Sequence, residues 1–205
     1  MLFEKAVARS FSVVDRALRR SFPADYHKRC MYAAFGMQKL LSDFGHEASI
    51  QGGDAVAFMV SRSGQQAGMQ GFANAPEGHA HYWVVAAGRL VDIGPHYLPQ
   101  DSSFPAADVP LICWDLAGAL PPFLRCRVFG DFGPLTALIT TEEIHERMEA
   151  FIEQCRSKAK NLVGQPKLPT WLLTSLETVE RSAAQSDVWA KGALRFASCL
   201  ALRRA

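Results

Sequence analysis

The 205-residue sequence predicts an α+β fold, and three observations support this class. Apolar residues recur at helical spacing near both ends of the chain. Segments of strand-like composition fill the middle, so the order is helix, helix, strands and then helices. The composition, 49% hydrophobic and 20% charged, is that of an ordinary globular protein. We expect a single domain over residues 1–205, in which residues 140–205 form a helical C-terminal extension packed on the rest.

The first two helices are predicted from periodicity and from turn residues. Residues 3–21 carry apolar side chains at three- and four-residue steps, with Lys and Arg on the other face: Phe3, Val7, Phe11, Val14 and Leu18. Pro23 and Asp25 then interrupt the pattern, and a second helix is predicted to start near Tyr26. Gly45 is suited to end this helix. Cys30 is therefore predicted to lie in its first turns.

The middle of the chain predicts an antiparallel sheet. Residues 47–61 indicate one strand, or two strands divided at Gly52 and Gly53, and residues 61–78 indicate a long loop with room for a short strand. Two strong strand candidates follow, joined by a tight turn at Ala87 and Gly88. The region from 96 to 134 is rich in proline and aromatic residues, and within it LICWDL and FLRCRVFG are the further strand candidates.

From residue 140 onward the pattern is helical. Thr140 and Glu143 have the spacing of a capping box and predict the start of a long helix. Two further helices are predicted over residues 169–185 and 186–205.

Charge and cysteine content exclude several classes of protein. The formal net charge is +2, which does not indicate a nucleic-acid or anionic-membrane partner. The N-terminal segment has charges throughout and lacks the uninterrupted apolar stretch of a signal peptide, and no segment approaches a membrane span, so we expect a cytoplasmic protein. Five cysteines without a CxxC pair indicate reduced thiols rather than a zinc site. We expect four of them to be core residues: Cys113, Cys126, Cys155 and Cys199.

The stretch HAHYWVVAAGRLVD, residues 79–92, brings polar residues to an otherwise apolar hairpin. A two-residue turn at Ala87 and Gly88 places Trp83 opposite Asp92, and His81 shares their face of the sheet. Asp92 can then accept a hydrogen bond from one nitrogen of the His81 ring and leave the other nitrogen free. A three-residue turn would shift the register and direct Asp92 away.

Cys30 is a candidate partner for this histidine. A thiol near a helix N-terminus lies at the positive end of the helix dipole, and an adjacent imidazolium further favours the thiolate. The sequence therefore predicts a Cys30 nucleophile, a proton-transferring His81 and an orienting Asp92. Backbone N–H groups at the start of the helix would stabilise an oxyanion.

These residues resemble the transglutaminase-like superfamily, a branch of the papain-like cysteine hydrolases. The resemblance rests on Cys30 at the start of a helix, on the strand His81-Tyr82-Trp83-Val84 and on Asp92 on the next strand, and it covers about residues 26–95. It implies an antiparallel sheet packed on the Cys30 helix and acyl-transfer or amide-hydrolysis chemistry through a thioester, without a cofactor.

The substrate implied by this family is a peptide or protein, or a small amide or acyl donor. Residues expected near the substrate are Trp83, which packs beside the site, Tyr26 and His79. His79 shares strand parity with His81 and could compete for its role, but His81 has the family's spacing to Trp83 and Asp92. The oligomeric state has no signal in the sequence.

Two alternatives remain open. His79 and His81 lie on one predicted strand face with Asp92 nearby, and His96 could join them to bind iron or zinc. The second alternative is that the protein is a catalytically inactive relative of this family, which keeps the fold and binds a peptide or protein partner.

Overall fold

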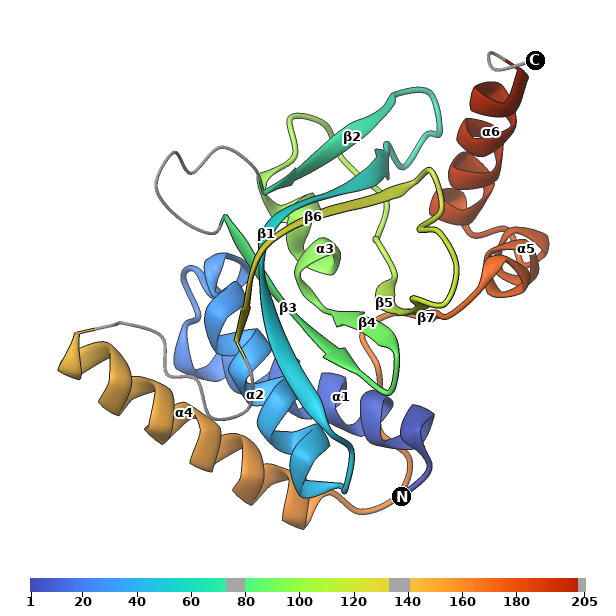
Figure 1. The fold of residues 1–205 in the computed structure, drawn as a ribbon. Coiled ribbons are helices and arrows are strands. Elements are labelled where there is room, and N and C mark those ends of the chain that lie inside the picture. Colours follow the sequence, from blue (N-terminus) through green and yellow to red (C-terminus); the bar gives the residue numbers. More distant parts are fainter. Residues whose placement is uncertain (73–79, 133–140, 203–205) are drawn as a thin grey trace.

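The computed structural model describes residues 1–72, 80–132 and 141–202, and it has a mixed α+β architecture. A curled sheet occupies the centre, and helices pack on both of its faces (Figure 1). The α-helices are α1 (Phe3–Ser21), α2 (Cys30–Asp43), α3 (Gly94–Tyr97), α4 (Glu142–Asn161), α5 (Leu176–Ala184) and α6 (Val188–Leu202). Two short 3₁₀ helices, η1 (Tyr26–Lys28) and η2 (Leu98–Asp101), precede α2 and follow α3.

The described residues form a seven-stranded sheet in the order β2-β1-β3-β4-β5-β7, and β6 also pairs with β1. Its strands are β1 (Ala48–Val60), β2 (Ala67–Phe72), β3 (His81–Ala86), β4 (Arg89–Asp92), β5 (Leu111–Asp115), β6 (Leu124–Phe132) and β7 (Leu172–Leu173). All pairs are antiparallel except β5 with β7. The 13-residue β1 is one continuous strand that pairs with β3 in its first half and with β2 in its second half.

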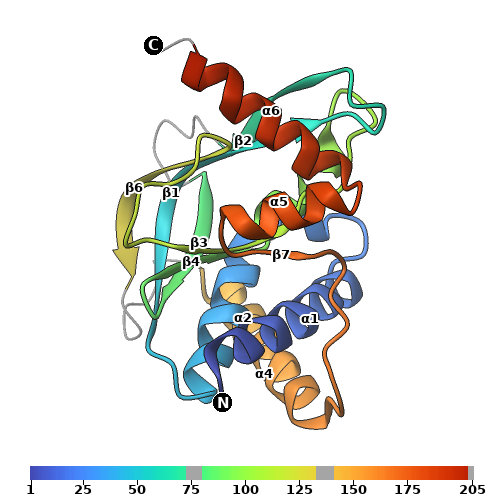
Figure 2. The same ribbon diagram turned by 90° about the vertical axis from the view of Figure 1, so that its right-hand side faces the viewer.

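Two hydrophobic cores lie on opposite faces of the sheet (Figure 2). Helices α1, α2 and α4 pack together against one face, where Ile50 and Val84 point. Helices α5 and α6 belong to the second core, where Trp189 is fully buried and its indole nitrogen donates to the Phe58 carbonyl at 2.8 Å. β1 supplies side chains to both cores, because its first half (Ala48 and Ile50) lines the first core and its second half (residues 57–60) lines the second.

The predicted hairpin register is present. Val84 pairs with Val91 and Ala86 with Arg89 across a two-residue turn. Ala87 and Gly88 both have positive φ, 49° and 70°, which is the backbone of a primed hairpin turn. The register therefore directs His81 and Asp92 toward each other.

Two details of the predicted C-terminal helices are corrected by the structure. The N-cap of α4 is Thr141, whose hydroxyl accepts from the Ile144 N–H, so the capping residue lies one position beyond the expected Thr140, which is outside the described residues. Residues 169–185 do not form one helix, because Leu172–Leu173 form β7 beside β5 and α5 begins only after the Ser175 cap. The hydroxyl of Ser175 caps the backbone of Thr178, which sets this later start.

No helix in the described part of the chain has the length and apolar character needed to cross a bilayer. Two of the four cysteines expected in the core are buried, Cys113 and Cys155. Cys126 is half-buried and Cys199 is exposed on α6, so the expectation was wrong for Cys199. The buried residues of α6 are Trp189, Ala190 and Ala193, and Cys199 does not lie on the face that they form.

Candidate active site

Cys30 is the first residue of α2 and is partly exposed. The chain turns through η1 just before it, and the Arg29 N–H closes this turn on the Tyr26 carbonyl at 3.2 Å. No side chain caps the N-terminus of α2, whereas α4 and α5 are capped by Thr141 and Ser175. The first-turn N–H groups of α2 therefore have no side-chain acceptor among the described residues, as an anion site at a helix start requires.

His81 and Asp92 form a buried pair. His81 is the first residue of β3 and is 0% exposed, and Asp92 is the last residue of β4 and is 5% exposed. The imidazole Nε2 lies 2.7 Å from Asp92 Oδ2. The other carboxylate oxygen, Oδ1, accepts a hydrogen bond from the Gly94 N–H at 2.7 Å. The carboxylate is thereby fixed by two neighbours and in turn fixes the orientation of the ring.

The second ring nitrogen of His81, Nδ1, is buried and has no well-aligned hydrogen-bond partner among the described residues. Cys30 nevertheless acts on the ring through hydrogen bonding and charge, so the thiol lies close to it. Burial alone would lower the pKa of His81, but Asp92 and, less strongly, Cys30 raise it to about 10. The Asp92 carboxylate therefore favours the protonated form of the imidazole.

Aromatic packing and one glycine enclose the His81 ring. Phe72, the last residue of β2, stacks on the ring with centroids 4.2 Å apart and planes 9° from parallel. On Gly94, a Cβ atom would lie only 2.2 Å from His81 Cε1. A side chain at position 94 would thus collide with the ring, and the glycine permits the close approach.

Tyr82 is a further residue next to the thiol. It follows His81 on β3 and packs partly buried against the core that α2 lines. Burial raises the pKa of Tyr82, and the charge of Cys30 raises it further. The charge of the Cys30 sulfur therefore acts on the Tyr82 phenol. As neighbours on β3, the Tyr82 and His81 side chains point to opposite faces of the strand.

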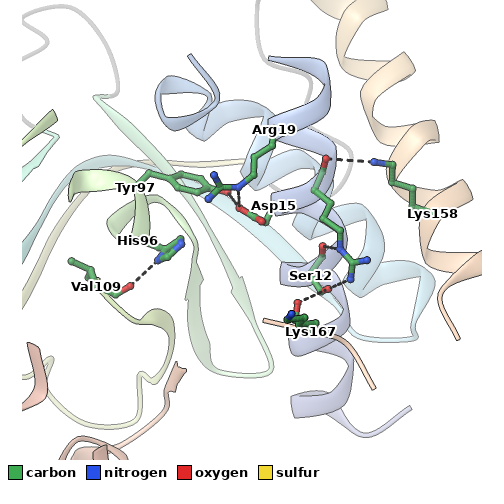
Figure 3. Close-up of polar contacts among 9 residues, drawn as sticks. Ser12, Asp15, Arg19, His96, Tyr97, Val109, Lys158 and Lys167 are labelled. Atoms are coloured by element: carbon green, nitrogen blue, oxygen red, sulfur yellow. Dashed lines mark hydrogen bonds and ion pairs between the residues drawn. The ribbon is translucent and has the colours of Figure 1, made fainter. Parts of the chain in front are cut away.

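A second polar cluster joins the segment that precedes Cys30 to the segment that follows Asp92 (Figure 3). Asp15 of α1 accepts hydrogen bonds from Arg19 Nε at 2.8 Å and from the Tyr97 hydroxyl at 2.9 Å. Tyr26 packs edge-on against Tyr97, with centroids 5.3 Å apart, and the Arg19 guanidinium lies 4.4 Å from the centre of the Tyr26 ring. We call Asp15, Arg19, Tyr26 and Tyr97 the Asp15 cluster.

The residues predicted to lie near a substrate have different locations. Trp83 is 1% exposed, and its indole nitrogen donates to Gln51 Oε1 at 3.1 Å. Tyr26 belongs to the Asp15 cluster, four residues before Cys30. His79 lies outside the described residues. A role for these three residues in substrate binding stays a prediction.

The candidate metal ligands are only partly described. His96 is largely buried, its Nδ1 lies 2.9 Å from the Val109 carbonyl (Figure 3), and burial lowers its pKa. Within residues 1–72, 80–132 and 141–202, no group of three or more His, Cys, Asp or Glu side chains is arranged to hold a metal ion.

Three residues of the site were not identified from the sequence: Phe72, Tyr82 and Gly94. Phe72 lies in a region expected to be mainly loop, and its stacking depends on β2 pairing with the end of β1. Gly94 did carry a signal, because it follows Asp92 by two residues and a glycine so placed can mark a close approach.

Comparison with known proteins gives no family for this chain. No family model matches it, and no curated protein matches it. One solved structure, a genomics target, aligns over 83% of this chain and 84% of its own length, with 20% sequence identity and a TM-score of 0.46.

Proposed function

We propose that the protein is a cysteine-dependent enzyme that transfers or hydrolyses acyl groups, with Cys30 as nucleophile, His81 as proton carrier and Asp92 as the residue that orients His81. The observation that carries the proposal is the fully buried His81 ring, whose Nε2 is paired with Asp92, whose Nδ1 remains without a partner among the described residues, and which the nearby Cys30 thiol influences. A cysteine beside a histidine that a third group orients is the arrangement that covalent catalysis requires.

In this mechanism, the resting pair is a thiolate on Cys30 and an imidazolium on His81. The sulfur attacks the substrate carbonyl carbon, and the oxyanion is received by backbone N–H groups at the start of α2. His81 donates its proton to the leaving amine as the carbon–nitrogen bond breaks, which leaves a thioester on Cys30. Water or an amine then attacks the thioester while His81 accepts its proton, and the carbon–sulfur bond breaks. This step releases the carboxylic acid or new amide and restores the Cys30 thiolate beside the protonated His81.

The fold proposal is a transglutaminase-like core of α2 and the strands that follow it. Support comes from the order helix, strand and hairpin, from Cys30 at the first position of α2, and from the pairing of β3 with β4. The substrates proposed are those of this chemistry: a peptide or protein, or a small amide or acyl donor.

The test is the alkylation rate of Cys30 with iodoacetamide at about pH 6, where an ordinary thiol is almost fully protonated. Peptide mass spectrometry would compare Cys30 with Cys199, which is exposed and serves as a control within the same molecule. We expect Cys30 to react at least about tenfold faster, because the imidazolium of His81 favours the thiolate. In His81→Gln, Cys30 should lose this advantage while Cys199 keeps its rate.

Two outcomes would refute the enzyme. Equal rates at Cys30 and Cys199 would favour the alternative, a domain that retains the fold and binds a peptide or protein. A stoichiometric metal in the purified protein that is lost in His79→Ala would favour the metal site instead.

A further inference from the structure

A surface hollow lies between α6 and the turn that joins β1 to β2. Its volume is about 350 Å³, within the range of small-molecule pockets. Figure 2 shows α6 passing beside this edge of the sheet. Its apolar lining includes Val188 and Phe196 of α6, which are partly exposed, and Phe58 and Val60 of β1, which are buried. Phe58 and Phe196 stack with centroids 5.1 Å apart, so Phe196 is the ring of this pair that a ligand would contact.

A glycine brings the two walls close enough to form the hollow. At Gly192 of α6, a Cβ atom would lie 3.0 Å from Phe58 Cε1 and 3.3 Å from Val60 Cβ. A side chain at this position would therefore be crowded against Phe58 and Val60. The cavity thus depends on a specific close packing of helix on strand.

Three cations surround this apolar lining: Arg62, Lys191 and Arg195. No carboxylate lines the hollow, and none of the three forms an ion pair with another described residue. The neighbouring Asp187 is occupied, because its oxygens accept from the Ala190 N–H at 2.8 Å and from Trp171 Nε1 at 3.2 Å.

Lys191 and Arg195 are one turn apart on α6, where like charges repel. The carboxylate of Asp187 caps the start of α6 and offsets the charge of Lys191, but no carboxylate in the lining of the hollow offsets that of Arg195. An anion in the hollow would reduce the repulsion between the two cations, and an apolar group attached to it would cover the Phe196 ring.

From this complementarity we propose that the hollow binds a small amphipathic carboxylate, whose apolar chain lies on Val188 and Phe196 and whose carboxylate is held by Lys191, Arg195 and Arg62. The ligand is a free molecule of the fatty-acid or arylalkanoate class. This site is independent of the Cys30 chemistry.

Isothermal titration calorimetry with octanoate tests the proposal. We expect saturable binding to the full chain, at least about tenfold weaker binding of octanol, which lacks the charge, and no detectable binding of acetate, which lacks the chain. The double variant Lys191→Gln with Arg195→Gln should weaken octanoate binding at least about tenfold, because it removes charge-assisted hydrogen bonds. Arg125→Gln, a cation of β6 outside the hollow, is the matched control and should leave binding unchanged.

A second variant tests the location without altering charge. Ala67→Phe adds a ring to the wall formed by β2 and should abolish octanoate binding, with its fold checked by circular dichroism. The proposal is overturned if octanoate does not bind, if octanol binds equally well, or if the double variant binds like the original chain. Binding only to vesicles of anionic lipid, with none to free octanoate, would also overturn it.

Discussion

Asp15 and Asp92 are both buried carboxylates, 7% and 5% exposed, but their partners differ in one chemical property. Asp15 accepts from Arg19, which keeps its charge at every accessible pH, and from Tyr97, whose pKa is raised by burial and by the charge of Asp15. Asp92 accepts from His81, an imidazole that changes charge and has a second nitrogen directed elsewhere.

The Asp15 cluster has the features of a structural contact, whereas the His81–Asp92 pair has features that the proposed chemistry would need. The Asp15 cluster joins α1 to α3 and orders Tyr26 just before α2, and its carboxylate satisfies both donors. The His81–Asp92 pair leaves a buried nitrogen unsatisfied, a free-energy cost that a purely structural pair would avoid. The Cys30 thiol lies near this ring, and the proposed proton transfer would use the unsatisfied nitrogen.

The largest effect is expected when the Asp15 carboxylate is removed. Asp15→Ala leaves the buried Tyr97 hydroxyl without its acceptor and should lower the free energy of unfolding by about 3 kcal/mol. Arg19 contributes less to this loss because its side chain is 42% exposed and can reach water. Urea denaturation would measure the change, with the surface replacement Glu149→Gln as a control near zero.

The alkylation rate of Cys30 should distinguish Asp15 from Asp92. At a urea concentration of zero, folded Asp15→Ala should keep the fast alkylation of Cys30, whereas Asp92→Asn should lose it. If Asp15→Ala also slows Cys30 to the rate of Cys199 in a sample that is fully folded, the division between the two clusters is wrong.

A smaller effect is expected from Gly94→Ala. The new Cβ would lie 2.2 Å from His81 Cε1, so the ring must move and its 2.7 Å contact with Asp92 must lengthen. We expect a loss of about 2 kcal/mol in the free energy of unfolding, together with slower alkylation of Cys30. Gly118→Ala is the matched control, because nothing lies within 4 Å of its added Cβ. Equal behaviour of the two variants would mean that the ring is not confined as described.

The smallest effect, taken per pH unit, is a pH dependence of stability. The pKa of His81 is about 10 in the folded chain against an ordinary value of 6.5, so its stabilisation is complete below pH 6.5 and is lost as the pH rises toward 10. In Cys30→Ser, where no thiolate offsets the proton held by His81, the unfolding free energy should fall by about 1 kcal/mol per pH unit through this group. Urea titrations between about pH 7 and pH 8.5 should show a shallower slope when His81→Gln is added to Cys30→Ser. Identical slopes in these two variants would refute a protonated His81.

Local sequence patterns predicted the part of the site that depends on local geometry. The turn at Ala87 and Gly88 fixed the register of the hairpin, so the pairing of His81 with Asp92 could be inferred before the structure. The helix over residues 3–21 was predicted with the observed bounds because its apolar stripe is regular.

Contacts between distant segments could not be predicted in this way. Phe72 reaches His81 only because β1 curls and carries β2 across the hairpin, and no local pattern encodes that curvature. Similarly, Leu172–Leu173 have the composition of a helix, and pairing with β5 overrides it. The role of Asp15 also depended on a residue 82 positions away, Tyr97.

The length of β1 has a consequence for how the molecule tolerates change. This strand pairs with β2, β3 and β6, and its first half lines one core while its second half lines the other. An inserted residue near its middle would shift the second half against β2 and β6 and turn its side chains away from the second core. The length of β1 is therefore constrained by two interiors at once.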